Sequence, residues 1–148
     1  MFIGRINFRP NFIMTYKLLF DFGIVVLIWM TQLIVYPSFT HFNPTDLQQW
    51  HASYTIRISI LVMPLMFGQL GFHIYHLTQN TGLLPIIALV LIGLAWANTF
   101  LFAVPLHNQI GSGIEIVESA QKLVSVNAWR TGFWSIVFLI DLYLILKK

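Results

Sequence analysis

The chain has 148 residues, of which 57% are hydrophobic and 9% charged, with a net charge of +3 and no cysteine. Soluble domains carry about 25% charged residues, so this composition indicates a membrane protein. The lack of cysteine excludes disulfides, iron–sulfur clusters and thiol catalysis, and the scattered basic residues exclude a nucleic-acid-binding face.

A helix of about 20 apolar residues crosses the hydrocarbon core of a bilayer. Four segments meet this requirement, at residues 18–36, 58–77, 83–106 and 128–146. Residues 1–16 mix apolar and basic side chains and are expected to form an interfacial arm. Pro64 should kink the second span, which has a polar helical lead-in from Leu47. The prediction is a single all-α domain over 1–148, an integral membrane four-helix bundle.

Basic residues favour the cytoplasmic side of a membrane and thereby orient the spans. With four spans, both ends of the chain lie on one side, and the basic residues near them are Arg5, Arg9, Lys17, Lys147 and Lys148. We therefore expect cytoplasmic N- and C-termini and a multi-pass protein of the inner (plasma) membrane, with the lipid bilayer as its surroundings.

Polar side chains repeat at helical spacing within three of the spans, and such groups normally face the interior of a bundle. Three inward faces are predicted: Lys17, Asp21 and Gln32 on the first helix; His51, Thr55, Ile58, Val62, Gln69, His73 and His76 on the second; and Asn127, Thr131, Trp134 and Asp141 on the fourth, with Arg130 at the edge.

These polar residues divide by depth into two groups. The outer group comes from the ends of all four helices and the first loop, and it contains Tyr36, His41, Trp50, His51, Tyr54, Arg57, His107, Asn108, Asn127, Trp129 and Arg130. The inner group contains Asp21, His73, His76 and Asp141. The outer group is richer, so the sequence places the candidate site there. Inner ion pairs of Asp21 with Lys17 and of Asp141 with Lys148 are the structural alternative for that end.

Several chemistries fit the outer group. His41, His51 and His107 are candidate ligands for a transition metal, and His51 and His107 on facing helices are candidate ligands for haem. Alternatively, His51 or His107 acts as a general base while Arg57 or Arg130 holds an anionic substrate. Tyr54 and Asn127 complete the candidate catalytic set. Each histidine also has a structural interpretation, as a hydrogen-bonding residue at the membrane interface.

Two stretches carry a family resemblance. The first consists of residues 36–39 (Tyr-Pro-Ser-Phe), 50–58 (Trp-His-Ala-Ser-Tyr-Thr-Ile-Arg-Ile) and 62–66, and the second of residues 104–108 (Val-Pro-Leu-His-Asn) and 127–131 (Asn-Ala-Trp-Arg-Thr). Together they resemble small four-helix bacterial membrane proteins of unknown function. The second stretch is also similar to motifs of the anthrone-oxygenase-like family, except that His107 stands at that family's Asn position. The resemblance implies a four-helix membrane fold and oxidation of an aromatic substrate by dioxygen.

Three functions follow as alternatives. The first is a membrane oxidoreductase or oxygenase that acts on a hydrophobic small molecule, such as an aromatic or quinol-like compound. The second is a bundle that binds haem or a metal, and this comparison rests on architecture alone. The third is an accessory or assembly subunit without catalytic activity, bound to other membrane subunits.

Overall fold

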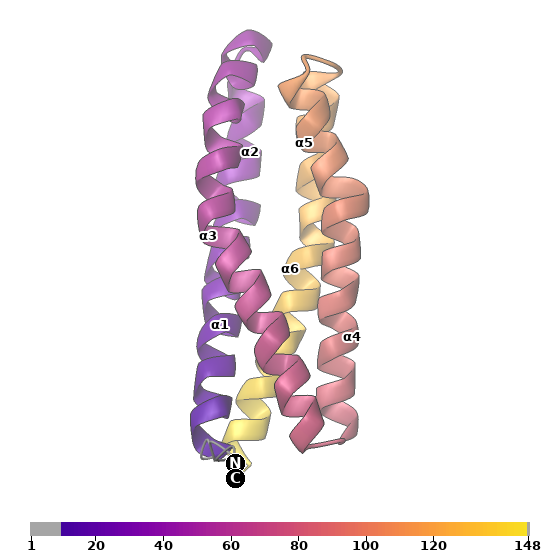
Figure 1. Ribbon diagram of the computed structural model, residues 1–148. Helices are drawn as coiled ribbons and strands as arrows, with labels where there is room; N and C mark the ends of the chain where they lie inside the picture. The colour runs from indigo at the N-terminus through magenta and orange to yellow at the C-terminus, as the bar shows by residue number, and fades with distance from the viewer. Residues whose placement is uncertain (1–9, 148) are drawn as a thin grey trace, which may run out of the picture.

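The computed structural model describes residues 10–147, and in that range the chain forms long helices joined by short connections (Figure 1). The first membrane-crossing helix consists of α1 (Pro10–Met30), the π-helical turn η1 (Thr31–Val35), α2 (Tyr36–Ser38) and the 3₁₀ turn η2 (Phe39–His41). The second is α3 (Pro44–Gln79). The third consists of α4 (Leu83–Asn98), the π-helical turn η3 (Thr99–Ala103) and α5 (Val104–Gly111), and the fourth is α6 (Ile116–Leu146).

The predicted all-α four-helix fold is confirmed, and each helix is longer than its apolar segment. The four spans contain 29, 36, 29 and 31 residues. At 1.5 Å per residue these helices are about 44–54 Å long, so each is long enough to cross a bilayer of about 40–45 Å including its headgroups, and the longest extends beyond it. The expected interfacial arm is helical from Pro10 onwards, and its residues 1–9 lie outside the described part of the chain.

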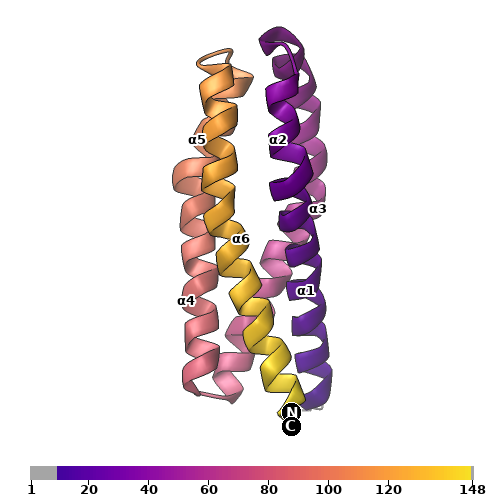
Figure 2. The same cartoon turned by 180° about the vertical axis from the view of Figure 1, so that it is seen from behind.

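The helices form two hairpins, α1 with α3 and α4 with α6, and both hairpins start from the same end of the bundle (Figure 1). Helices α3 and α6 cross: α6 lies beside α5 at the loop end and beside α1 at the end that holds the chain termini (Figure 2). Helix α3 bends about midway (Figure 1), in the region of Pro64, whose ring removes one backbone hydrogen bond. This crossing brings α1, α3 and α6 together near the termini.

Large apolar side chains cover the outer surface of the bundle along its whole length. Leu33, Ile60, Leu83, Leu101 and Leu139 are each more than half exposed. The buried apolar residues form three clusters stacked along the bundle, centred on Phe39 and Leu123, on Ile28 and Trp134, and on Ile92 and Val137. Because so large an apolar surface is unfavourable in water and the four helices are long enough to cross a bilayer, the chain is a multi-pass membrane protein in contact with lipid.

Candidate functional site

Two histidines and a tyrosine from three different helices form a hydrogen-bonded chain near the end of the bundle opposite the chain termini. Nε2 of His51 on α3 lies 2.8 Å from Nδ1 of His107 on α5, and Nε2 of His107 lies 3.0 Å from the Tyr36 hydroxyl on α2. His51 and Tyr36 are almost completely buried. His107 therefore has both ring nitrogens engaged, one by each partner.

Arg130 of α6, in the same hairpin as His107, also reaches this chain. Its side chain is 6% exposed and lies beside the hydroxyls of Tyr36 and Tyr54, and its guanidinium carbon is 5.2 Å from the ring centre of Trp134. The Nε atom of Arg130 is buried and has no hydrogen-bond partner among the described residues. A buried donor without a partner is costly, so the arrangement is suited to an acceptor that enters from outside.

The two π-helical turns explain how Tyr36 and His107 come to face one another. Each π turn begins with a threonine whose hydroxyl donates to a carbonyl one turn earlier, and each is followed by a proline, Pro37 or Pro105. A proline ring clashes with the carbonyl four residues before it, and the wider π turn moves that carbonyl away. Tyr36 stands immediately before the first proline and His107 shortly after the second.

A cavity of about 710 Å³ lies between the two hairpins, with His51 and His107 in its wall. Polar residues gather toward one end, namely Tyr36, His51, Tyr54, Thr55, His107, Asn108, Ser112 and Arg130. The deeper wall is mostly apolar, with Ile24, Ile28, Val62, Met66 and Trp134, and it also carries the hydroxyls of Thr31, Ser59 and Thr99. Met63 of α3 and Phe100 of η3 also line it and are 41% and 50% exposed, so the cavity borders on lipid between these elements. Its volume and its mixture of lining residues are typical of small-molecule sites.

The structure brings together only part of the predicted site. His51, His107, Tyr54 and Arg130 line the cavity, whereas His41 and Arg57 are exposed and do not line it. Asn127 is buried outside the cavity lining and donates to Gln32 at 2.9 Å, so it holds α6 against η1. The candidate site is therefore smaller than the set inferred from depth along the helices.

The His51–His107 contact is a hydrogen bond and does not have the spacing that tetrahedral metal ligation or haem ligation requires. Two imidazole nitrogens bonded at about 2.0–2.1 Å to one tetrahedral metal ion are about 3.3 Å apart, and they are about 4 Å apart when they bind opposite faces of a haem. The observed separation is 2.8 Å, and the second nitrogen of His107 faces Tyr36. His41 does not approach as a third ligand, and Arg130 adds a positive charge beside the pair.

The inner polar group is more tightly connected than the sequence indicated. Lys17 pairs with Asp141 at 2.8 Å, in place of the Lys17–Asp21 pair expected, and Lys148 lies outside the described residues. Asp21 instead contacts His73 at 3.1 Å and accepts a hydrogen bond from Gln69 at 2.7 Å. Lys17, Asp21, Gln69 and Asp141 are 0–1% exposed. The inward stripes contained these residues, but they gave no indication of which residue pairs with which.

The fold and the site together define a multi-pass α-helical membrane protein with a polar-headed cavity that borders on lipid. No protein-family model, curated protein or solved structure matches the chain.

Proposed function

We propose that the cavity binds a lipid-soluble aromatic molecule that carries a carbonyl or hydroxyl group on its ring, such as an anthrone or a quinol. We propose further that the protein is an oxidoreductase for this molecule. The observation that carries this proposal is the His51–His107–Tyr36 chain, which lies with Arg130 at the more polar end of a mostly apolar cavity. A planar apolar substrate would enter from lipid past Met63 and Phe100 and place its oxygen beside Arg130.

The histidine chain supplies a base for such a substrate. A neutral imidazole has one donor and one acceptor nitrogen, so a proton taken at one end of the Tyr36–His107–His51 chain reverses every hydrogen bond along it. The unpaired Nε–H of Arg130 would stabilise the resulting substrate anion, since charge is best held by donors already fixed in a site poor in water.

The resemblance to the anthrone-oxygenase-like family suggests dioxygen as the oxidant. In that reaction the substrate methylene group, flanked by aromatic rings and acidified by the ring carbonyl, loses its two hydrogens and becomes a carbonyl. One oxygen atom of dioxygen enters the product and the other leaves as water, so the substrate and dioxygen balance without a further electron donor. The protein's own part is to bind the substrate, remove a proton and hold the anion.

Oxygen uptake by the full-length protein in detergent, with anthrone as the probe, tests the proposal. We expect His107→Ala to lower the rate above the spontaneous background by at least about 10²-fold, as for loss of a general base. Arg130→Ala should lower it by about 10²–10³-fold. The matched controls are His41→Ala and Arg57→Ala, which remove the same side chains from exposed positions and should leave the rate unchanged.

Binding of anthraquinone, the product of this reaction, separates catalysis from binding. If the protein binds anthraquinone but consumes no oxygen, the cavity is a binding site and the oxidoreductase proposal is wrong. If Arg130→Ala and His107→Ala both retain the wild-type rate, the residues assigned to the site are wrong.

We further propose that the chain lies in the plasma membrane with both ends in the cytoplasm, which would turn the polar head of the cavity outward. Basic residues near both ends support this orientation, namely Arg5, Arg9, Lys147 and Lys148. Lys17 no longer contributes to the argument, because it is buried against Asp141 and is not a charge of the membrane surface.

A further inference from the structure

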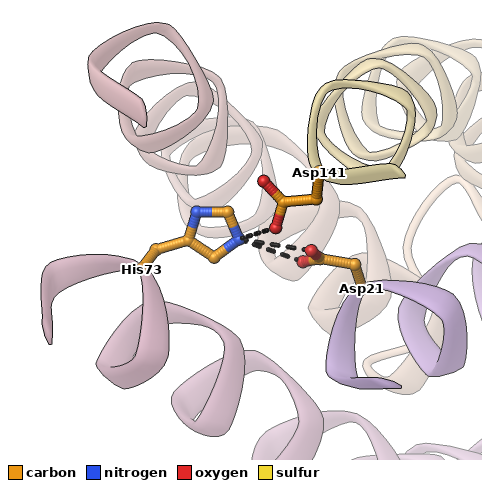
Figure 3. A group of neighbouring side chains, drawn as sticks. All are labelled: Asp21, His73 and Asp141. Carbon is orange, nitrogen blue, oxygen red and sulfur yellow. Dashed lines mark hydrogen bonds and ion pairs between the residues drawn. The ribbon is translucent and has the colours of Figure 1, made fainter. Parts of the chain in front are cut away.

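A second cluster of ionisable side chains lies beneath the cavity, toward the end of the bundle that holds the chain termini. Nε2 of His73 on α3 points between the carboxylates of Asp21 on α1 and Asp141 on α6 (Figure 3). It lies 3.1 Å from an oxygen of Asp21 and 3.4 Å from an oxygen of Asp141. Three separate helices thus each contribute one ionisable group to a single point in the bundle interior.

The charges of this cluster do not cancel. When His73 is neutral, the two carboxylates and the Lys17 ammonium, which pairs with Asp141 at 2.8 Å, carry a net charge of −1. Among the residues that the structure describes, His76 adds an ionisable neighbour through its Nδ1, 3.1 Å from Lys17 Nζ, and α4 on the other side contains no ionisable residue. An uncompensated charge is expensive inside a membrane protein, and a single bound proton makes the cluster neutral.

A proton fits this site better than a metal ion does. The ligand atoms of Asp21, His73 and Asp141 all lie within 4.8 Å of one another, which alone would suit a divalent cation. The Lys17 ammonium, however, already forms an ion pair with one oxygen of Asp141. A divalent ion bound to the other oxygen would therefore be repelled by a positive charge on the same carboxylate. The proton adds only the single positive charge that the cluster lacks.

The cluster is joined to the cavity by one side-chain contact. Trp134 lines the cavity wall, and its Nε1 donates to the Gln69 carbonyl at 3.0 Å. The Gln69 amide in turn donates to Asp21 at 2.7 Å. Ile24 and Met66, also in the cavity lining, lie one helical turn from Asp21 and Gln69 respectively, so a single layer of side chains separates cavity and cluster.

We propose that Asp21, His73 and Asp141 form a binding site for one exchangeable proton, and that the Trp134–Gln69 contact links its occupancy to the ligand in the cavity. The link to a ligand rests on the proposed function, while the proton site does not. A ligand that displaces Trp134 changes the hydrogen bond that Gln69 gives to Asp21, and proton and ligand then alter one another's binding by the same factor. Lys17 and His76, which is 7% exposed, lead from the cluster toward the termini.

Infrared spectra of the full-length protein in lipid nanodiscs, with ¹³C in the aspartate carboxyl groups, test the proton site without any ligand. The chain has three aspartates, of which Asp46 is exposed. We expect a protonated-carboxyl band at neutral pH that Asp21→Asn or Asp141→Asn removes and that Asp46→Asn leaves in place. Wild-type protein without such a band at neutral pH overturns the proposal, even if a variant fails to fold.

Elemental analysis of the same sample provides the second criterion. A stoichiometric metal whose removal by a chelator changes the aspartate bands would also overturn the proton site. No metal, together with the protonated band, supports it.

The link between the proton site and the cavity is tested separately. Anthraquinone is added to protein in a weakly buffered solution, and the change in pH on binding is measured. Wild-type protein should release or take up protons when it binds, and Gln69→Leu should bind but lose at least half of that signal. Equal proton exchange by wild type and Gln69→Leu would refute the link. Absence of anthraquinone binding would refute the proposed function and the link, and it would leave the infrared result standing.

Discussion

Replacement of Lys17 by methionine removes the cation from a fully buried ion pair, and its cost follows from the surroundings of Asp141. Lys17 and Asp141 have side-chain exposures of 0% and 0% and lie 2.8 Å apart. Without the ammonium, one more carboxylate of the cluster must take up a proton. A carboxyl group that titrates near about pH 3.9 in water costs about 4 kcal/mol to protonate at about pH 7, because each pH unit contributes about 1.4 kcal/mol.

We therefore expect Lys17→Met to lose about 4 kcal/mol of stability at neutral pH, or about 10 °C in melting temperature. Protonation becomes easier as the pH falls, so the loss should shrink on acidification by about 1.4 kcal/mol per unit and grow on alkalinisation. Thermal melts of detergent-solubilised protein at several pH values measure this.

The matched control is Lys122→Met. Lys122 pairs with Glu118 at 2.7 Å, but their side chains are 54% and 58% exposed, so solvent screens the pair and the melting temperature should stay unchanged. Equal losses for the two variants, or a loss in Lys17→Met that does not change with pH, would refute the reasoning.

Three further predictions concern packing, the cavity and orientation. Gly68→Ala places a Cβ against the ring of Phe20 and should cost about 1–3 kcal/mol in thermal melts. Gly71→Ala, with nothing within 4 Å, should be neutral or slightly stabilising. Equal melting temperatures of the two variants would contradict the close approach of α1 and α3. Tyr36→Phe leaves a nitrogen of His107 without its partner and should lower stability by about 1–3 kcal/mol. The control Tyr143→Phe, at an exposed position, should leave stability unchanged. An unchanged melting temperature of Tyr36→Phe would argue against the hydrogen bond. A fluorescent-protein fusion at the C-terminus should fluoresce and a phosphatase fusion there should be inactive; the reverse pattern would invert the proposed orientation.

The helical pattern of the sequence was sufficient to predict the four helices and their inward faces, because a buried polar residue repeats with the helical period. His51, Gln69 and His73 were placed on one stripe of α3, and all three are buried. The same periodicity indicates that Arg57 does not face inward, because it lies about 100° from the inward-facing Ile58. Arg57 is nevertheless part of the predicted site because of its depth along the helix. In the structure, Arg57 is exposed.

The sequence alone does not predict which residues pair between helices. A helical stripe indicates which residues face inward, but the partner of each residue depends on the crossing of α3 and α6 and on the positions of the helices along the bundle axis. Lys17 therefore has Asp141 as its partner, from the far end of the chain, although Asp21 is one turn away on its own helix. The π turns were also missed, because Pro37 and Pro105 indicated only that a helix ends or bends.

The extra residue in each π turn has a consequence for how this protein tolerates changes in length. One residue added to a helix rotates everything after it by about 100° and lifts it by about 1.5 Å. A π turn absorbs its extra residue, so the helix after it keeps its phase. Deleting Leu101, which does not line the cavity, would therefore restore an ordinary α turn and leave His107 facing His51, whereas deleting one residue from the regular part of α4 would turn His107 by about 100°. The π turn thus gives this helix one residue of length that it can lose without separating the two histidines.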